Sequence, residues 1–149
     1  MNIKEILYNE CEAFVNNRLE TIERIISSNK NALYSETKSS AGDKHETGRS
    51  MLQLEMEKAG QQLKGVQQMK ETLARIVLNT NSSTGCLGSV IETNSFTYFL
   101  SISAGKILIN DKTFFAVSVS SPIGKLLLGK TVNDELIFNG NKITIKNIL

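Results

Sequence analysis

The sequence predicts an α+β protein in which an N-terminal antiparallel α-helical coiled-coil hairpin is followed by a small antiparallel β domain with one short helix. Up to Leu78, apolar residues recur every three or four positions, as they do on one stripe of a helix. Beyond a short polar segment, apolar and polar residues alternate and β-branched residues become frequent, which is typical of strands. A polar hexapeptide at residues 42–47 divides the helical half and predicts the tip of the hairpin.

Both predicted helical arms carry a continuous apolar seam, and no proline interrupts either arm. On the incoming arm the seam residues are Ile3, Ile6, Leu7, Cys11, Phe14, Val15, Leu19, Ile22, Ile25, Ile26 and Leu33. On the outgoing arm the spacing alternates between four and three, as in a heptad repeat, at Leu52, Met56, Ala59, Leu63, Val66, Met69, Leu73 and Ile76 or Val77. Gly60 and Gly65 lie within the outgoing arm and indicate a bend or a close contact. The arms alone are equally compatible with an ordinary helical dimerisation module.

The tip Gly42-Asp43-Lys44-His45-Glu46-Thr47 carries two carboxylates that are three residues apart. These residues fit a capping box, in which Asp43 at the N-cap and Glu46 at N3 satisfy free amides of the outgoing helix. They also fit a weak Mg²⁺ site, because this cation prefers hard oxygen ligands and keeps several of its waters. From the tip alone, capping is the commoner role of such a pair.

The second half of the chain predicts a linker at residues 79–85 and a β domain at residues 86–149, after a hairpin at residues 1–78. Strands are predicted at residues 88–92, 95–101, 106–109, 113–118, 135–138 and 142–148. Asn110-Asp111 and Asn139-Gly140 lie between apolar runs and predict hairpin turns, the second of type I′. Pro122 precedes the apolar run at residues 123–128 and suits the first turn of a short helix.

The composition of the chain argues against several classes of function. The net charge of +2 over 149 residues is too small for wrapping nucleic acid by bulk electrostatics. The chain opens directly into an amphipathic helix without a signal peptide, and no apolar run approaches the roughly 20 residues of a membrane span. A cytoplasmic location is therefore expected, with Cys11 and Cys86 reduced and unpaired. A zinc site is not expected because the chain has a single histidine, His45. A catalytic thiol is not expected either, because His45 at the tip would lie too far from Cys86 to act as its base.

A longer motif lies in the second half. The run Ser121-Pro122-Ile123-Gly124-Lys125-Leu126-Leu127-Leu128-Gly129-Lys130, followed by Asp134-Glu135-Leu136, resembles the C-terminal signature of the Gre family of bacterial transcript-cleavage factors. The tip of that family reads Gly-Asp-x-x-Glu-Asn, and residues 42–47 match it except at the last position. The order of coiled coil, acidic tip, linker and β domain also agrees, and the resemblance implies an FKBP-like fold for the β domain. Asn133 stands where the family usually has glycine, and Thr47-Gly48-Arg49 replaces the usual continuation of the tip, which indicates a divergent member.

The resemblance implies an accessory transcription elongation factor, not an enzyme by itself, whose partner is core RNA polymerase. The β domain would dock at the rim of the polymerase secondary channel, and the coiled coil would enter that channel. Asp43 and Glu46 would then help to hold a second Mg²⁺ and the attacking water, so that the polymerase cleaves backtracked RNA. The factor would be monomeric and would bind no membrane. It would bind no cofactor alone, since the Mg²⁺ is shared only in the complex, and it would act on the 3′ end of the nascent RNA indirectly.

Two sets of residues follow from the resemblance. The docking surface is assigned to Ser121, Pro122, Ile123, Gly124, Lys125, Gly129 and Lys130. Within it, Pro122 and Gly129 are expected to set the loop geometry, since proline fixes φ and glycine can take a positive φ, while Ile123 fits a core position as well as a contact. Contacts with RNA are assigned to Lys38, Lys44 and Arg49, although a solvated helical face is the commoner role of such charges. With the second motif in the same chain, the metal role of Asp43 and Glu46 is favoured over capping.

Two other functions stay open from the sequence. A polymerase-channel regulator could bind in the same way without cleavage, since it would differ only in tip geometry and metal occupancy. An FKBP-like prolyl isomerase, or a scaffold that dimerises through the hairpin, is disfavoured because the chain has no Trp and few aromatic residues to line a cleft.

Overall fold

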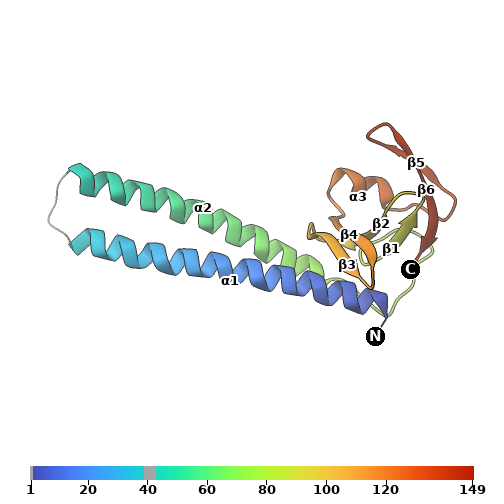
Figure 1. Cartoon of the computed structure of the whole chain (residues 1–149), viewed down its shortest axis with the longest axis horizontal. Helices are drawn as coiled ribbons and strands as arrows, with labels where there is room; N and C mark the ends of the chain where they lie inside the picture. Colours follow the sequence, from blue (N-terminus) through green and yellow to red (C-terminus); the bar gives the residue numbers. More distant parts are fainter. Residues whose placement is uncertain (1, 39–42) are drawn as a thin grey trace. The chain divides into compact units, whose positions relative to one another are not determined.

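The structure is a computed structural model that describes the backbone of residues 2–38 and 43–149 and the side chains of residues 2–35 and 48–149. Two long helices come first in the chain, and a mixed sheet of six strands with one short helix follows (Figure 1). The predicted α+β class is therefore confirmed.

The long helices are α1, Ile3–Lys38, and α2, Asp43–Ala74 (Figure 1). The described chain forms two compact units whose boundary falls inside both helices. The helical unit is Val15–Lys70, and the sheet unit combines Met1–Phe14 with Glu71–Leu149. The beginning of α1 and the end of α2 thus belong to the same compact unit as the sheet.

Within the helical unit, α1 and α2 lie side by side and each buries one face (Figure 1). Val15 and Ile22 on α1, and Ala59 and Val66 on α2, are no more than 3% exposed. All four belong to the apolar seams predicted from the sequence. A Cβ placed on Gly60 would have no atom within 4 Å, and the same holds for Gly65, so neither glycine marks a close contact.

The strands of the sheet unit are β1 Val90–Thr93, β2 Thr97–Ser101, β3 Gly105–Ile109, β4 Lys112–Ser118, β5 Glu135–Phe138 and β6 Asn141–Ile148. Helix α3, Pro122–Leu127, connects β4 to β5. The strand order is β3-β4-β2-β1-β6-β5, so β3 and β5 are the edge strands. These elements agree with the predicted strands and short helix, with ends that differ by at most two residues.

Two tight hairpins lie in the sheet where the sequence predicts them. Asn110 and Asp111 connect β3 to β4 with φ angles of 49° and 65°, and Asn139 and Gly140 connect β5 to β6 with φ angles of 52° and 78°. Positive φ at both central residues defines a type I′ turn, whose twist matches that of the paired strands. Asparagine, aspartate and glycine tolerate this conformation, so the local sequence was sufficient to predict both hairpins.

One strand pairing differs from the predicted antiparallel domain. Strand β4 pairs in parallel with β2, from Thr97 opposite Phe114 to Ser101 opposite Ser118, while the other four pairings are antiparallel. The sheet is therefore mainly antiparallel, as the sequence predicts, but the one parallel pairing was not predicted. Alternation of apolar residues shows which segments are strands, but it carries no information on the order in which distant strands pair.

The sheet unit buries apolar residues on both faces of the sheet. On one face, helix α3 contributes Ile123 and Leu127 to a core cluster with Tyr98, Leu100 and four other buried residues: Ile91, Leu136, Ile143 and Ile145. Alternation places Phe99 and Ser101 on the opposite face, where both are fully buried.

Two contacts tie the beginning of α1 to the rest of the sheet unit. The thiol of Cys11 lies 3.6 Å from the Ser101 hydroxyl on β2, and the Lys4 ammonium donates to the Thr80 carbonyl at 3.0 Å. Burial raises the pKa of the Cys11 thiol, and the Ser101 hydroxyl acts in the opposite direction. Burial also lowers the pKa of Lys4. Cys11 is therefore a buried, unpaired thiol, and Cys86 is also unpaired, as the sequence predicts.

Candidate functional site

Helix α3 holds the first part of the motif at residues 121–130, and Ser121 determines where it begins. Ser121 has an extended backbone, and its hydroxyl accepts a hydrogen bond from the Gly124 amide at 3.1 Å. The same hydroxyl donates to the Ser118 carbonyl at 2.6 Å. Pro122 follows at the first helical position, where its missing N–H leaves no bond unmade. The Ser-Pro pair thus fixes the start of a helix of only six residues.

Two glycines allow α3 to pack closely against its surroundings. A Cβ on Gly124 would lie 2.0 Å from the Ser118 carbonyl oxygen, and one on Gly85 would lie 2.3 Å from the Leu127 carbonyl oxygen. Gly85 also exchanges backbone hydrogen bonds with the end of the motif. Its carbonyl accepts from the Gly129 amide at 2.8 Å, and its amide donates to the Lys130 carbonyl at 2.8 Å. The motif is therefore fixed at both ends by backbone contacts.

The turn after α3 depends on two residues with positive φ. Gly129 has a φ of 77° and Asn133 a φ of 76°. Most residues with a Cβ avoid this region, whereas glycine enters it freely and asparagine tolerates it. Glycine at position 129 therefore suits the conformation that the chain adopts there. The backbone at Asn133 also explains why glycine would suit that position.

Asp134 closes the same turn through Thr131. One carboxylate oxygen of Asp134 accepts from the Thr131 amide at 2.8 Å and from the Thr131 hydroxyl at 3.1 Å. In return, the Asp134 amide donates to the Thr131 carbonyl at 3.0 Å. These two bonds to the carboxylate hold the pKa of Asp134 below its ordinary value of 3.8, with the Lys130 charge acting in the same direction.

The motif presents only part of its residues to solvent. Pro122, Lys125 and Gly129 are exposed, while Ser121 and Lys130 are half-buried. Ile123 is 7% exposed and belongs to the core cluster, and Gly124 is buried as well. Of the seven residues that the sequence assigns to docking, Ile123 and Gly124 therefore shape the surface from below.

The predicted acidic tip lies largely outside the described residues. Helix α2 begins at Asp43, so Asp43 and Glu46 fall in its first turn. Gly42 and the side chains of Lys38, Asp43, Lys44 and Glu46 lie outside the part of the chain that is described. Arg49, one turn further along α2, is exposed.

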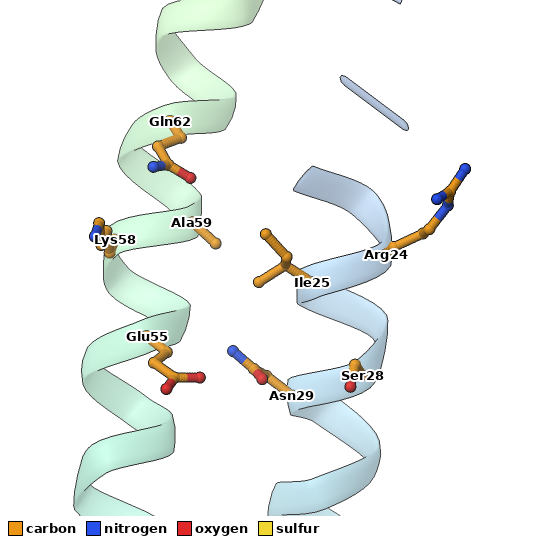
Figure 2. A pocket seen from close by; sticks show the side chains of 8 residues that line it. All are labelled: Arg24, Ile25, Ser28, Asn29, Glu55, Lys58, Ala59 and Gln62. Carbon is orange, nitrogen blue, oxygen red and sulfur yellow. The ribbon is translucent and has the colours of Figure 1, made fainter. Parts of the chain in front are cut away.

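A groove of about 530 Å³ lies between α1 and α2 in the helical unit, and Asn29 forms part of its floor (Figure 2). Asn29 is 8% exposed, and its amide nitrogen points toward α2 near Glu55 and Ala59 (Figure 2). This nitrogen has no hydrogen-bond partner among the described residues. Sequence reasoning missed Asn29 as a buried residue, although it follows Ile22 and Ile25 on the same seam at helical spacing.

No helix in the described part of the chain combines the length and the apolar character that a membrane crossing requires. Within the same residues, no three side chains of His, Cys, Asp or Glu gather in a group that could hold a metal ion.

Comparisons with known proteins add no family assignment. No protein-family model matches the chain, and no curated protein does either.

Proposed function

We propose that this chain is a Gre-type transcription elongation factor that binds bacterial RNA polymerase at its secondary channel and stimulates cleavage of backtracked RNA. The observation that carries the proposal is the motif at residues 121–130 together with an acidic pair at the start of α2. The two features are remote in sequence, and each matches the family in the expected order. The backbone supports the motif, since Ser121, Pro122, Gly124 and Gly129 each have a role that few other residues could fill.

We propose further that each of the two compact units has the fold known for this family. The helical unit would be an antiparallel coiled coil, and the sheet with α3 would be an FKBP-like domain. Buried seam residues on both long helices support the first description. A short helix packed on one face of a mainly antiparallel sheet supports the second.

The chemistry would be divided between the factor and the polymerase. Asp43 and Glu46, one helical turn apart at the start of α2, would offer carboxylate oxygens to a Mg²⁺ that the polymerase partly holds. With two metal ions close together, one activates a water while both stabilise the oxygen atoms of an in-line displacement.

The docking surface would consist of the exposed part of the motif, with Lys125 at its centre. Reversal of this charge, Lys125→Glu, should weaken competition with the unmodified factor for core RNA polymerase by about tenfold. Lys146→Glu is the matched control, because Lys146 is an exposed lysine on β6 in the same unit. Equal competition by both variants, with unchanged melting temperatures, would remove the docking assignment.

The experiment requires the full chain. Residues 85–149 alone would lack Leu7 and Cys11, which are fully buried in the sheet unit. The fragment would also expose the Ser101 side of the sheet, since the thiol that contacts Ser101 would be missing. A fragment that fails to compete would therefore not distinguish a wrong docking surface from an unfolded domain.

A further inference from the structure

The edge strand β3 carries hydrogen-bonding groups with no partner strand on its outer side. Its hairpin with β4 closes at the pair Ile109 and Lys112, so bonded pairs alternate along the ladder from there. Ile107 and Gly105 accordingly direct their backbone groups toward β4. The N–H and C=O of Lys106 and Leu108 point outward, at the edge of the described sheet. Extended backbone groups in this arrangement fit another extended chain.

An apolar surface lies beside this edge. Leu108 is 64% exposed and Phe96 is 53% exposed. The rings of Phe96 and Phe115 meet edge to face at 5.0 Å, and Phe115 stands opposite Lys106 in the register of the two strands. Directly opposite residues share a face, so Lys106, Leu108 and Phe115 lie on one side of the sheet. We refer to Phe96, Leu108 and Phe115 as the β3 shelf.

The features that commonly protect an edge strand are weak in β3. Its register with β4 is unbroken over five pairs, it contains no proline, and Lys106 is its only charged residue. Edge strands usually avoid association through charges, prolines or bulges. The buried side chain of Ile107, 8% exposed, anchors the centre of the strand in the core.

The other edge of the sheet provides a comparison. Strand β5 also follows a type I′ hairpin, so Ile137 directs its backbone groups outward by the same alternation. Glu135 and Lys142 form an ion pair at 3.1 Å on the face that Ile137 occupies. Ile137 itself is 72% exposed, but the described residues place no aromatic pair beside it. β5 is thus a charged edge, whereas β3 is an edge with an aromatic shelf.

We propose that β3 binds an extended segment of a partner polypeptide by adding a strand to the sheet. The backbone of that segment would pair with Lys106 and Leu108. In an antiparallel addition, an aromatic or large aliphatic side chain would lie on the β3 shelf opposite Leu108. An acidic side chain two residues later in the segment would lie opposite Lys106, since alternate residues share a face. This site includes none of the residues assigned to polymerase docking and does not depend on that assignment.

The test uses the full chain, labelled with ¹⁵N, and the pentapeptide acetyl-Thr-Phe-Thr-Glu-Thr-amide. Its Phe and Glu share a face, so in antiparallel addition Phe meets Leu108 and Glu meets Lys106. The peptide should protect the Lys106 and Leu108 amides from hydrogen exchange and shift the Phe115 resonances. An isomer with adjacent Phe and Glu, acetyl-Thr-Phe-Glu-Thr-Thr-amide, should bind about tenfold more weakly because the two side chains then point to opposite faces.

Two proline variants locate the site. Leu108→Pro removes an outward N–H, a place where edge strands tolerate proline, and should weaken peptide binding by about tenfold. Ile137→Pro makes the same change on β5 and should leave the affinity unchanged. If Leu108→Pro unfolds the chain, Leu108→Asp keeps the backbone and places a charge on the shelf, with the same expected loss.

Three outcomes would overturn the proposal. One is an absence of protection at Lys106 and Leu108 with the peptide in large excess. Another is equal binding by the two proline variants or by the two peptides. The last is protection of these amides that depends on protein concentration without peptide, which would identify a second copy of this chain as the occupant of the edge.

Discussion

Asn29 places a buried amide in the apolar seam of α1, and this amide lowers the stability of the helical unit. Its Nδ2 has no partner among the described residues, and an unsatisfied buried donor costs about 1–3 kcal/mol. Asn29→Leu keeps the branching of the side chain and removes its polar group, and the groove beside it leaves room for the larger methyl groups, so the free energy of unfolding should rise by about 1 kcal/mol. Urea denaturation followed by circular dichroism measures this change.

Ser28→Ala is the control for Asn29→Leu, because Ser28 is an exposed neighbour on the same groove. Its stability should stay close to that of the unmodified chain, as is usual for surface substitutions. A loss of stability in Asn29→Leu would contradict this expectation. It would mean that the Asn29 amide makes a stabilising hydrogen bond in the groove.

Asp134 makes a second residue-scale prediction, on the dependence of stability on pH. Its pKa in the folded chain lies below the ordinary 3.8, so the unfolded chain binds more protons in the acidic range. The stabilisation by Asp134 is therefore complete above the unfolded pKa and is lost as the pH falls through the folded pKa. Asp134→Asn should have a lower melting temperature than the unmodified chain at pH 7, and this difference in melting temperature, the gap, should close below about pH 4.

Thr144→Ser serves as the control in the same melting series, since Thr144 is a half-buried threonine on β6 and the carboxylate of Asp134 accepts from Thr131 instead. Any gap that it shows should stay constant from pH 7 to pH 3 in the same buffers. A gap for Asp134→Asn that also stays constant over this range would contradict the assigned role of the carboxylate.

Local sequence predicted the residues whose conformation depends on their own chemistry. Positive φ at Gly129 and the start of α3 at Ser121-Pro122 follow from properties of those residues alone. Burial of Ile123 was not predictable in the same way, because an apolar residue in an exposed motif fits a core or a contact equally well. Asn29 was missed because its burial depends on the partner helix.

At the scale of elements, glycines in two helices should respond in opposite ways to the same substitution. Gly60 lies in the middle of α2 with open space around it, so Gly60→Ala should stabilise by about 0.5–1 kcal/mol. In α3 the added methyl group of Gly124→Ala would meet the Ser118 carbonyl at 2.0 Å, and backbone cannot move aside cheaply. That variant should lose about 1–3 kcal/mol.

Thermal denaturation of both variants and of Gly65→Ala tests this pair of expectations. Gly65 also has open space around it and should behave like Gly60. A stabilising Gly124→Ala would show that α3 can move away from Ser118, and the motif would then be less firmly fixed than its contacts indicate.

The elements of the sheet also show what a sequence determines. Both type I′ hairpins were predictable, because Asn110-Asp111 and Asn139-Gly140 are residues that accept positive φ. The parallel pairing of β2 with β4 was not, since it joins strands separated by β3 in the sequence. The sequence also does not show that β3 is an edge strand, because its edge position depends on this same pairing.

At the scale of the whole molecule, the compact units do not coincide with the predicted domains. The sequence places a boundary in the polar segment at residues 79–85, where the composition changes. Spatial contacts place it within both long helices instead, since residues at the start of α1 pack in the sheet unit. Composition reports where helix gives way to strand, whereas a compact unit depends on contacts between distant segments.

The central claim is that Asp43 and Glu46 supply carboxylates for metal-assisted RNA cleavage by the polymerase. The most direct measurement is release of RNA 3′ fragments from stalled, backtracked elongation complexes in Mg²⁺, with the unmodified chain and with the double variant Asp43→Asn, Glu46→Gln. The amide side chains keep the size of the carboxylates, and asparagine remains able to cap a helix, so melting and polymerase binding should not change. Mg²⁺ binding depends on the carboxylate charge, so cleavage should fall by at least about tenfold, with partial rescue by Mn²⁺. Two results would contradict this account. Full cleavage by the double variant would mean that the two carboxylates only stabilise the start of α2. Polymerase binding without cleavage by the unmodified chain would mean that the chain is a non-cleaving regulator of the polymerase.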